Sequence, residues 1–190
     1  MLEALSHIAT SFGLAWSAGL NAYLPLLIVA LTARFTSLLT LKPPFDALTD
    51  NLVIGVIVVL LLIETLVDKI PAVDTVNDAI QTFVRPAAGA ILFAANANAI
   101  GDVHPVLALV CGLILAGGVH AVKATARPVV TAVSGGMANP VVSMAEDAVS
   151  AAVTVTAILA PLLGVLLLAV ALALFVLWRR RRHRARPRSM

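Results

Sequence analysis

The sequence is organised around the stretch Glu64-Thr-Leu-Val-Asp68-Lys69-Ile-Pro71-Ala-Val-Asp74-Thr-Val-Asn77-Asp78, which continues to Arg85-Pro86. A second stretch of the same kind reads His120-Ala-Val-Lys123-Ala-Thr-Ala-Arg127-Pro128, then Ser134-Gly135-Gly136-Met137-Ala138-Asn139-Pro140, then Glu146-Asp147. Each lies between apolar runs. Charges so close to membrane-length apolar runs cost free energy unless they are paired or hydrated, so these stretches are where function is expected.

The composition predicts an integral membrane protein. Of the 190 residues 61% are hydrophobic and 12% are charged, and the mean hydropathy is +1.02. Soluble domains average about 45–50% apolar and about 25% charged residues. We therefore expect an all-α, polytopic membrane helical bundle that forms a single transmembrane domain over residues 1–178.

The net charge of +3 hides two opposite parts. Residues 179–188 contain seven arginines, so the rest of the chain carries six basic and ten acidic side chains. We expect residues 179–190 to be a disordered cytoplasmic tail that contacts anionic lipid headgroups. This pattern does not predict nucleic-acid binding.

Apolar runs predict about five membrane spans. Their ranges are residues 8–33, 51–67, 86–100, 105–123 and 146–178. The first is expected to kink at Pro25, because proline removes a backbone donor and clashes with the preceding turn. The second must include Glu64, because its uninterrupted apolar part is shorter than the about 20 residues that a crossing needs.

Two further segments are too short or too interrupted to cross. Residues 71–84 have helical periodicity, with an apolar and a polar stripe, and residues 128–145 contain Gly135-Gly136 and Asn139-Pro140. We expect both to be re-entrant or interfacial helical segments. Five spans place the N-terminus outside. In the alternative, residues 128–145 form a sixth, broken span and the N-terminus is inside.

The two charged stretches resemble each other in order, and their charges are complementary. The first begins with Glu64 and Asp68 and ends with Arg85. The second begins with the basic side chains of His120, Lys123 and Arg127, on one stripe at a predicted helix C-terminus, and ends with Glu146 and Asp147. Packed side by side, the stretches are expected to pair acid with base at both ends. Repeated broken helices of this kind build transport sites in known transporters.

Several motifs in one order resemble a known family. They are Gly19-Leu-Asn21-Ala22-Tyr23-Leu-Pro25, Glu64-x-x-x-Asp68-Lys69-Ile-Pro71-x-x-Asp74, Arg85-Pro86-x-x-Gly89, His120-x-x-Lys123-x-x-x-Arg127, Ser134-Gly135-Gly136, Asn139-Pro140 and Glu146-Asp147. Over residues 8–175 the chain resembles a bacterial membrane family known as domain of unknown function 4126. The resemblance implies a multi-span protein of the bacterial inner membrane and implies no activity.

Two functions are compatible with this sequence. The first is a small transporter or channel; its site would be formed by Glu64, Asp68, Lys69, Asp74, Arg85, His120, Lys123, Arg127, Asn139, Glu146 and Asp147. In the second, a structural or accessory membrane protein, the same charges only clamp the hairpins together. The surplus of acids favours a cation or a proton as the transported species. The lipid bilayer is the expected partner, and a homo-oligomer is compatible with the sequence.

An enzyme acting on lipid is a third hypothesis, which we do not favour. The sequence contains no metalloprotease, phosphate-loop, nucleophile-elbow or dinucleotide motif. One cysteine, Cys111, cannot form an internal disulfide, and no Cys/His metal spacing is present. We therefore expect no catalytic residue, no cofactor and no metal.

Overall fold

The computed structural model describes residues 2–67, 71–97, 103–161 and 170, with the backbone alone for residues 2–4, 71–76 and 78. Within these ranges the chain forms six α-helices and a short 3-10 helix, η1, and contains no strand. They are α1 (Leu2–Leu20), α2 (Tyr23–Phe35), η1 (Phe45–Thr49), α3 (Asn51–Val67), α4 (Pro71–Ala97), α5 (Pro105–Ser134) and α6 (Asn139–Leu159). The predicted all-α class is confirmed for this part of the chain.

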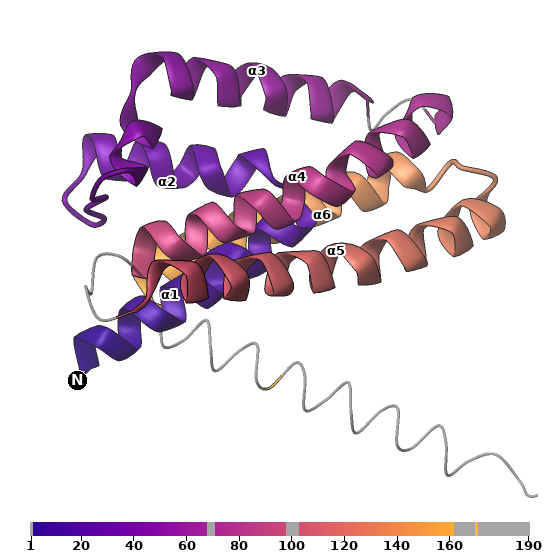
Figure 1. The fold of residues 1–190 in the computed structure, drawn as a ribbon. Helices are drawn as coiled ribbons and strands as arrows, with labels where there is room; N and C mark the ends of the chain where they lie inside the picture. The colour runs from indigo at the N-terminus through magenta and orange to yellow at the C-terminus, as the bar shows by residue number, and fades with distance from the viewer. Residues whose placement is uncertain (1, 68–70, 98–102, 162–169, 171–190) are drawn as a thin grey trace, which may run out of the picture.

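Helix α1 is the central element of the bundle. It packs against α4, α5 and α6, and the most extensive helix pair is α4 with α5. Helix α3 lies on the outside and contacts chiefly α2 (Figure 1). The C-terminal end of α3 and the turn that follows α5 lie at the same end of the bundle in Figure 1.

The predicted single span over residues 8–33 is wrong. The chain breaks at Asn21 and Ala22, and α2 returns toward the end at which α1 begins (Figure 1). Pro25 does not kink a helix. It lies in the first turn of α2, where the N–H group that proline lacks has no partner in the helix. The turn between the two helices is buried inside the bundle, because Asn21 and Ala22 are almost fully covered.

The two predicted short segments are parts of long helices. Helix α4 runs unbroken through Pro86, so residues 71–84 and 86–97 form one helix. Helix α5 likewise runs through Pro128 to Ser134, and residues 139–145 begin α6. At Pro86, packing compensates for the missing backbone hydrogen bond, because the proline ring lies against Gly117 of α5. Helices tolerate proline where neighbouring groups cover the freed carbonyl.

Glycine fixes the turn between α5 and α6. Gly135 and Gly136 have φ angles of +60° and +85°, a left-handed conformation that favours glycine and commonly ends helices. The interruption expected from Gly135-Gly136 and Asn139-Pro140 is confirmed, because α5 ends at Ser134 and α6 begins at Asn139. Helix α6 begins at Asn139, so the predicted start of the last span at residue 146 is wrong. The helix ends at Leu159, next to Pro161, and most of the predicted remainder of that span lies outside the described residues.

Two described helices, α5 and α6, are long and apolar enough to cross a membrane, and α2 and α3 are shorter apolar helices. The predicted number of five crossings is thus not confirmed and stays a prediction.

Small residues let α1, α4 and α5 approach closely. The backbones of Gly89 and Gly112 are in contact across the α4–α5 interface, and a side chain on Gly19 would meet Ala116 and Val119 of α5. Close backbone approach through small residues is how membrane helices associate, since lipid gives no hydrophobic force between them. This tight interface holds the inward faces of α4 and α5 at a fixed distance.

Candidate functional site

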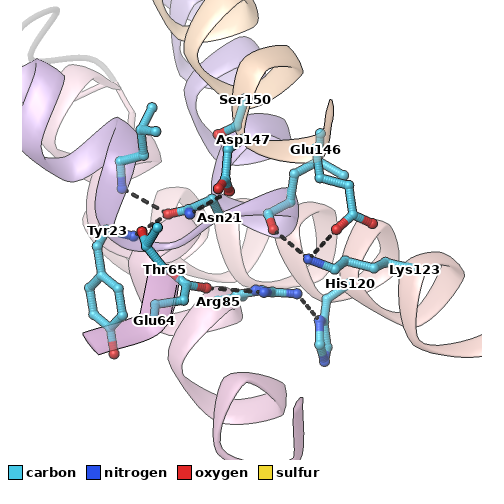
Figure 2. A network of polar contacts seen from close by, with 12 residues as sticks. Asn21, Tyr23, Glu64, Thr65, Arg85, His120, Lys123, Glu146, Asp147 and Ser150 are labelled. Atoms are coloured by element: carbon cyan, nitrogen blue, oxygen red, sulfur yellow. Dashed lines mark hydrogen bonds and ion pairs between the residues drawn. The ribbon is translucent and has the colours of Figure 1, made fainter. Parts of the chain in front are cut away.

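Arg85 is the centre of a buried polar cluster. Its side chain is 0% exposed, and it is the largest fully buried side chain among the described residues. Nη2 donates to Oε1 of Glu64 on α3 at 3.1 Å, and Nη1 lies 3.0 Å from Nδ1 of His120 on α5. Figure 2 shows the guanidinium between these two groups. Arg85 therefore joins the first charged stretch to the second.

Lys123 forms the second charged contact of the cluster. It lies one turn beyond His120 on the inward face of α5, and its Nζ is 2.7 Å from Oε2 of Glu146 on α6. The same ammonium donates to the backbone oxygen of Leu20 at 3.1 Å. That oxygen is available because α1 ends at Leu20, and the last carbonyls of a helix have no partner within it. A cation at this position also suits the negative end of the helix dipole.

Asn21 connects the α1–α2 turn to α6. Its Oδ1 accepts hydrogen bonds from the N–H groups of Tyr23 and Leu24, at 3.0 and 2.9 Å, and so satisfies the first donors of α2. Its Nδ2 donates to Oδ1 of Asp147 at 2.8 Å (Figure 2). Asn21 thus holds the broken helix against the cluster.

Hydroxyl groups continue the polar contact between α1 and α6. Ser150 donates to the carbonyl oxygen of Ser17 at 3.0 Å, and Thr154 donates to the Ser17 hydroxyl at 2.9 Å. Further along, Thr10 donates to the carbonyl oxygen of Ala157 at 2.8 Å. These bonds fix the position of α6, and with it Glu146 and Asp147.

Most of the predicted site residues lie in this cluster or beside it. The structure places six of them there: Glu64, Arg85, His120, Lys123, Glu146 and Asp147. Arg127 is buried on the same face of α5, and Asn139 is buried at the start of α6, where its Oδ1 accepts from Thr131 at 3.1 Å. Asp68 and Lys69 lie outside the described residues, and of Asp74 only the backbone position in α4 is described.

The predicted pairing of acids of one stretch with bases of the other stays a prediction, because Asp68 and the side chains of Asp74 and Asp78 lie outside the described residues. Two ion pairs of the described residues each join the two arms of one hairpin: Glu64 with Arg85 across α3 and α4, and Lys123 with Glu146 across α5 and α6. The stretches meet through His120. The Lys123–Glu146 pair follows from helix length: α5 and α6 extend beyond the predicted boundaries, so Glu146 lies within α6, opposite Lys123.

The helix-dipole explanation for the basic stripe is wrong. His120, Lys123 and Arg127 do share one face, as predicted, and all three are buried. However, α5 continues to Ser134, so none of them lies in its last turn. Burial inside the bundle, with Glu146 beside Lys123 and with Arg85 and Thr82 beside His120, accounts for the stripe.

Asn21 and Thr82 are the residues of the cluster that the predicted site did not include. The signal for Asn21 was present, because asparagine followed closely by proline favours a chain break and a helix start. Thr82 gives no comparable signal. Its role follows only from the unbroken α4, which places it one turn before Arg85 and 3.1 Å from Nε2 of His120.

The described charges of the cluster balance. Glu64, Glu146 and Asp147 are matched by three basic side chains, Arg85, Lys123 and Arg127. His120 adds an imidazole, the side chain whose charge ordinarily changes near neutral pH. Among the residues with described side chains, no group of three or more His, Cys, Asp or Glu could hold a metal ion.

Exchanging the two groups of the Asn21–Asp147 contact tests its geometry. Asn21→Asp keeps an acceptor for the α2 N–H groups but places a carboxylate against Asp147, so we expect a loss of about 1–3 kcal/mol. Adding Asp147→Asn restores one donor and one acceptor, and we expect most of the loss to be recovered. Thermal unfolding in detergent measures both. An Asn21→Asp variant as stable as the wild type would contradict the contact.

Comparison with known proteins gives one result. The family model described as Domain of unknown function (DUF4126) matches residues 8–181, which is most of the chain, so the chain belongs to this family. No curated protein and no solved structure matches it.

Proposed function

We propose that this member of the domain of unknown function 4126 family is an integral membrane protein that moves a small ion across the bilayer, by way of the polar cluster around Arg85. The single observation that carries the proposal is the burial of this cluster inside a bundle whose outer surface is apolar. Arg85 is 0% exposed, whereas Phe83, two residues earlier on α4, is 79% exposed.

The distribution of side chains over the bundle supports a lipid environment. On α4, Gln81 and Arg85 face inward, while Ile80 and Phe83 face outward. In the most apolar 18-residue segment of α5, and in that of α6, only 22% of the residues are buried. The core helix of a soluble protein is mostly buried. Large apolar side chains outside and charges inside suit a chain whose solvent is hydrocarbon.

The energetics of buried ion pairs support a function for the cluster. Replacing a buried pair by apolar side chains of similar volume is often neutral or stabilising, because desolvation costs about as much as the attraction returns. Stability alone therefore gives little reason to keep three acids and three bases inside an apolar bundle. Ionisable groups at membrane depth mark ion and proton paths in membrane proteins.

The broken α1–α2 hairpin supports the same conclusion. Discontinuous helices whose ends meet near the middle of the membrane build the sites of many transporters, since their free carbonyls and N–H groups bind ions. Here the free carbonyl of Leu20 binds the Lys123 ammonium, and Asn21 covers the N–H groups of α2. The turn has the character of an ion site that is occupied by a side chain of the protein.

The orientation and partners of the chain rest on its sequence. We propose that the C-terminus is cytoplasmic, in the inner membrane of a bacterium, with the arginines of residues 179–188 at anionic lipid headgroups. About five crossings and a homo-oligomer belong to the same proposal. We propose no enzymatic activity and no cofactor.

Ion flux in proteoliposomes tests the proposal. We expect the wild type to carry at least one ion, among rubidium, sodium, chloride and protons, faster than protein-free vesicles. Glu64→Gln and Lys123→Ala should reduce this flux about tenfold or more, because each removes one charge of a buried pair. Thr125→Ala on the exposed face of α5 is the matched control and should leave the flux unchanged. Equal flux in both charge variants and the wild type would contradict the proposal.

One observation favours a second function, that of a structural or accessory membrane protein. Two ion pairs of the described residues each join the two arms of one hairpin, a placement that holds each hairpin closed. This alternative predicts that Lys123→Glu and Glu146→Lys each lower the melting temperature, that the double exchange restores it, and that no ion flux exceeds the vesicle background.

A further inference from the structure

The hydrogen bonds of His120 define its tautomer. Nδ1 lies 3.0 Å from Nη1 of Arg85, and Nε2 lies 3.1 Å from the hydroxyl oxygen of Thr82. An arginine side chain has donors and no acceptor, so Nδ1 must accept this bond with its lone pair. The proton of the ring is then on Nε2, which donates it to the Thr82 hydroxyl. In this arrangement the imidazole is neutral, although it lies among charged groups.

Charged side chains from four helices form the polar cluster to which this ring belongs. They are Glu64 from α3, Arg85 from α4, Lys123 and Arg127 from its own helix, and Glu146 and Asp147 from α6. The acids and bases of this set balance. The imidazole is the side chain of this set whose charge ordinarily changes near neutral pH.

Resting on the proposed function, we propose that the ion handled at this site is a proton and that His120 is its carrier. The proton binds to the Nδ1 lone pair and forms an N–H bond, which gives an imidazolium. No electron is transferred and no other bond breaks. The Nδ1 lone pair then no longer accepts from Arg85, and two positive charges face each other at hydrogen-bond distance. Proton binding and the Arg85–His120 contact are therefore mutually exclusive.

Arg85 has a second partner that makes this exchange feasible. Its Nη2 already donates to Glu64 at 3.1 Å, so the guanidinium can turn toward α3 when His120 becomes charged. The Arg85–His120 bond links the first hairpin to the second. Each protonation therefore breaks this one bond between the hairpins, which couples proton binding to a movement of the Arg85 side chain across the fixed α4–α5 interface.

The two ring nitrogens face different surroundings. His120 is 3% exposed, and Nδ1 faces the buried guanidinium, whereas Nε2–H donates to Thr82, which belongs to the exposed residues of α4. The imidazolium can lose its Nε2 proton through the Thr82 hydroxyl. This loss leaves the ring proton on Nδ1, and the Nε2–H tautomer returns only when Nε2 takes up a proton and Nδ1 releases one. In the forward transfer the proton thus enters at Nδ1 and leaves from Nε2.

Proton flux into vesicles that contain a pH-sensitive dye tests the proposal, with a potassium gradient and valinomycin as the driving force. His120→Gln keeps an acceptor for Arg85 and a donor for Thr82 but cannot take up a proton. We expect it to lower the proton flux about tenfold or more, with an unchanged melting temperature. Thr82→Ala should lower the flux several-fold. His104→Asn removes an imidazole at the exposed start of α5 while keeping a cap, and should leave the flux unchanged.

The outcomes separate the two proposals. Proton flux equal in His120→Gln and the wild type would overturn the assignment of the carrier. Rubidium or sodium flux that requires Glu64, without any proton flux, would overturn the assignment of a proton as the transported ion. The proposed function would then still stand. If no ion moves, both fail.

Nitrogen-15 NMR of histidine-labelled protein in detergent gives an independent test. At neutral pH, the signals that disappear in His120→Gln should report a ring protonated at Nε2 and unprotonated at Nδ1. A ring protonated at Nδ1 would overturn the proposal even if proton flux is observed.

Discussion

Replacing Arg85 by methionine is expected to lower the free energy of unfolding by about 3–5 kcal/mol, because it removes the guanidinium that pairs with the buried Glu64 carboxylate. The same change removes the donor to His120 Nδ1. For a chain of this size, such a loss corresponds to a fall of about 6–20 °C in melting temperature. Thermal unfolding in detergent measures it.

A second substitution distinguishes a lost pair from a packing defect. In the double variant Arg85→Met, Glu64→Met, no unpaired charge remains, so we expect most of the stability to return. Arg34→Met is the matched control. Arg34 is exposed, and its Nη1 donates only to the carbonyl oxygen of Thr49, so the expected loss is within about 1 kcal/mol. Losses that simply add in the double variant would contradict a buried Glu64–Arg85 pair.

A single added methyl group at Gly112 is expected to have an effect of similar size. A Cβ atom there would lie 2.7 Å from Cβ of Phe93 and 2.8 Å from Cα of Ala90, and closer still to the carbonyl oxygen of Gly89. Two of these atoms belong to the backbone of α4 and cannot turn aside. Gly112→Ala should therefore separate α4 from α5 and cost about 3 kcal/mol, the upper part of the range for overpacking.

Gly118 provides the control within the same helix. A Cβ atom on Gly118 meets no atom within 4 Å, so Gly118→Ala should gain about 0.5–1 kcal/mol from helix propensity. Melting temperatures of the two variants compare the sites directly. If both substitutions shift the melting temperature in the same direction, the close α4–α5 interface is absent in solution.

Residues that break helices were the main source of error in predicting the fold. Pro86 and Pro128 lie inside long helices, since packing and buried partners compensate for a missing hydrogen bond that local sequence rules treat as a boundary. Gly135 was predicted correctly, because a left-handed turn depends on the local backbone alone. The break at Asn21 depends on local sequence and on packing. Its side chain caps the neighbouring helix α2, and it also binds Asp147, which is far away in the sequence.

The members of the cluster were easier to predict than its contacts. Glu64, Arg85, His120 and Lys123 are charged or polar groups next to apolar runs, and the cost of exposing them to lipid indicates burial from the sequence alone. Their partners depend on how far each helix extends and on which faces meet. The sequence did not indicate that His120 would contact Arg85 and so join the two hairpins.

The central claim is that this cluster lies inside a bundle surrounded by lipid, and spin-label accessibility in liposomes tests it most directly. Labels at Leu62→Cys, Phe83→Cys and Ile114→Cys, made in a Cys111→Ala background, occupy apolar positions that are 58%, 79% and 65% exposed. Asp46→Cys in η1 is the exposed, polar reference position. We predict that the three labels collide often with oxygen, which dissolves in hydrocarbon, and rarely with a water-soluble nickel complex. Nickel collisions as frequent at all three as at position 46 would contradict the account.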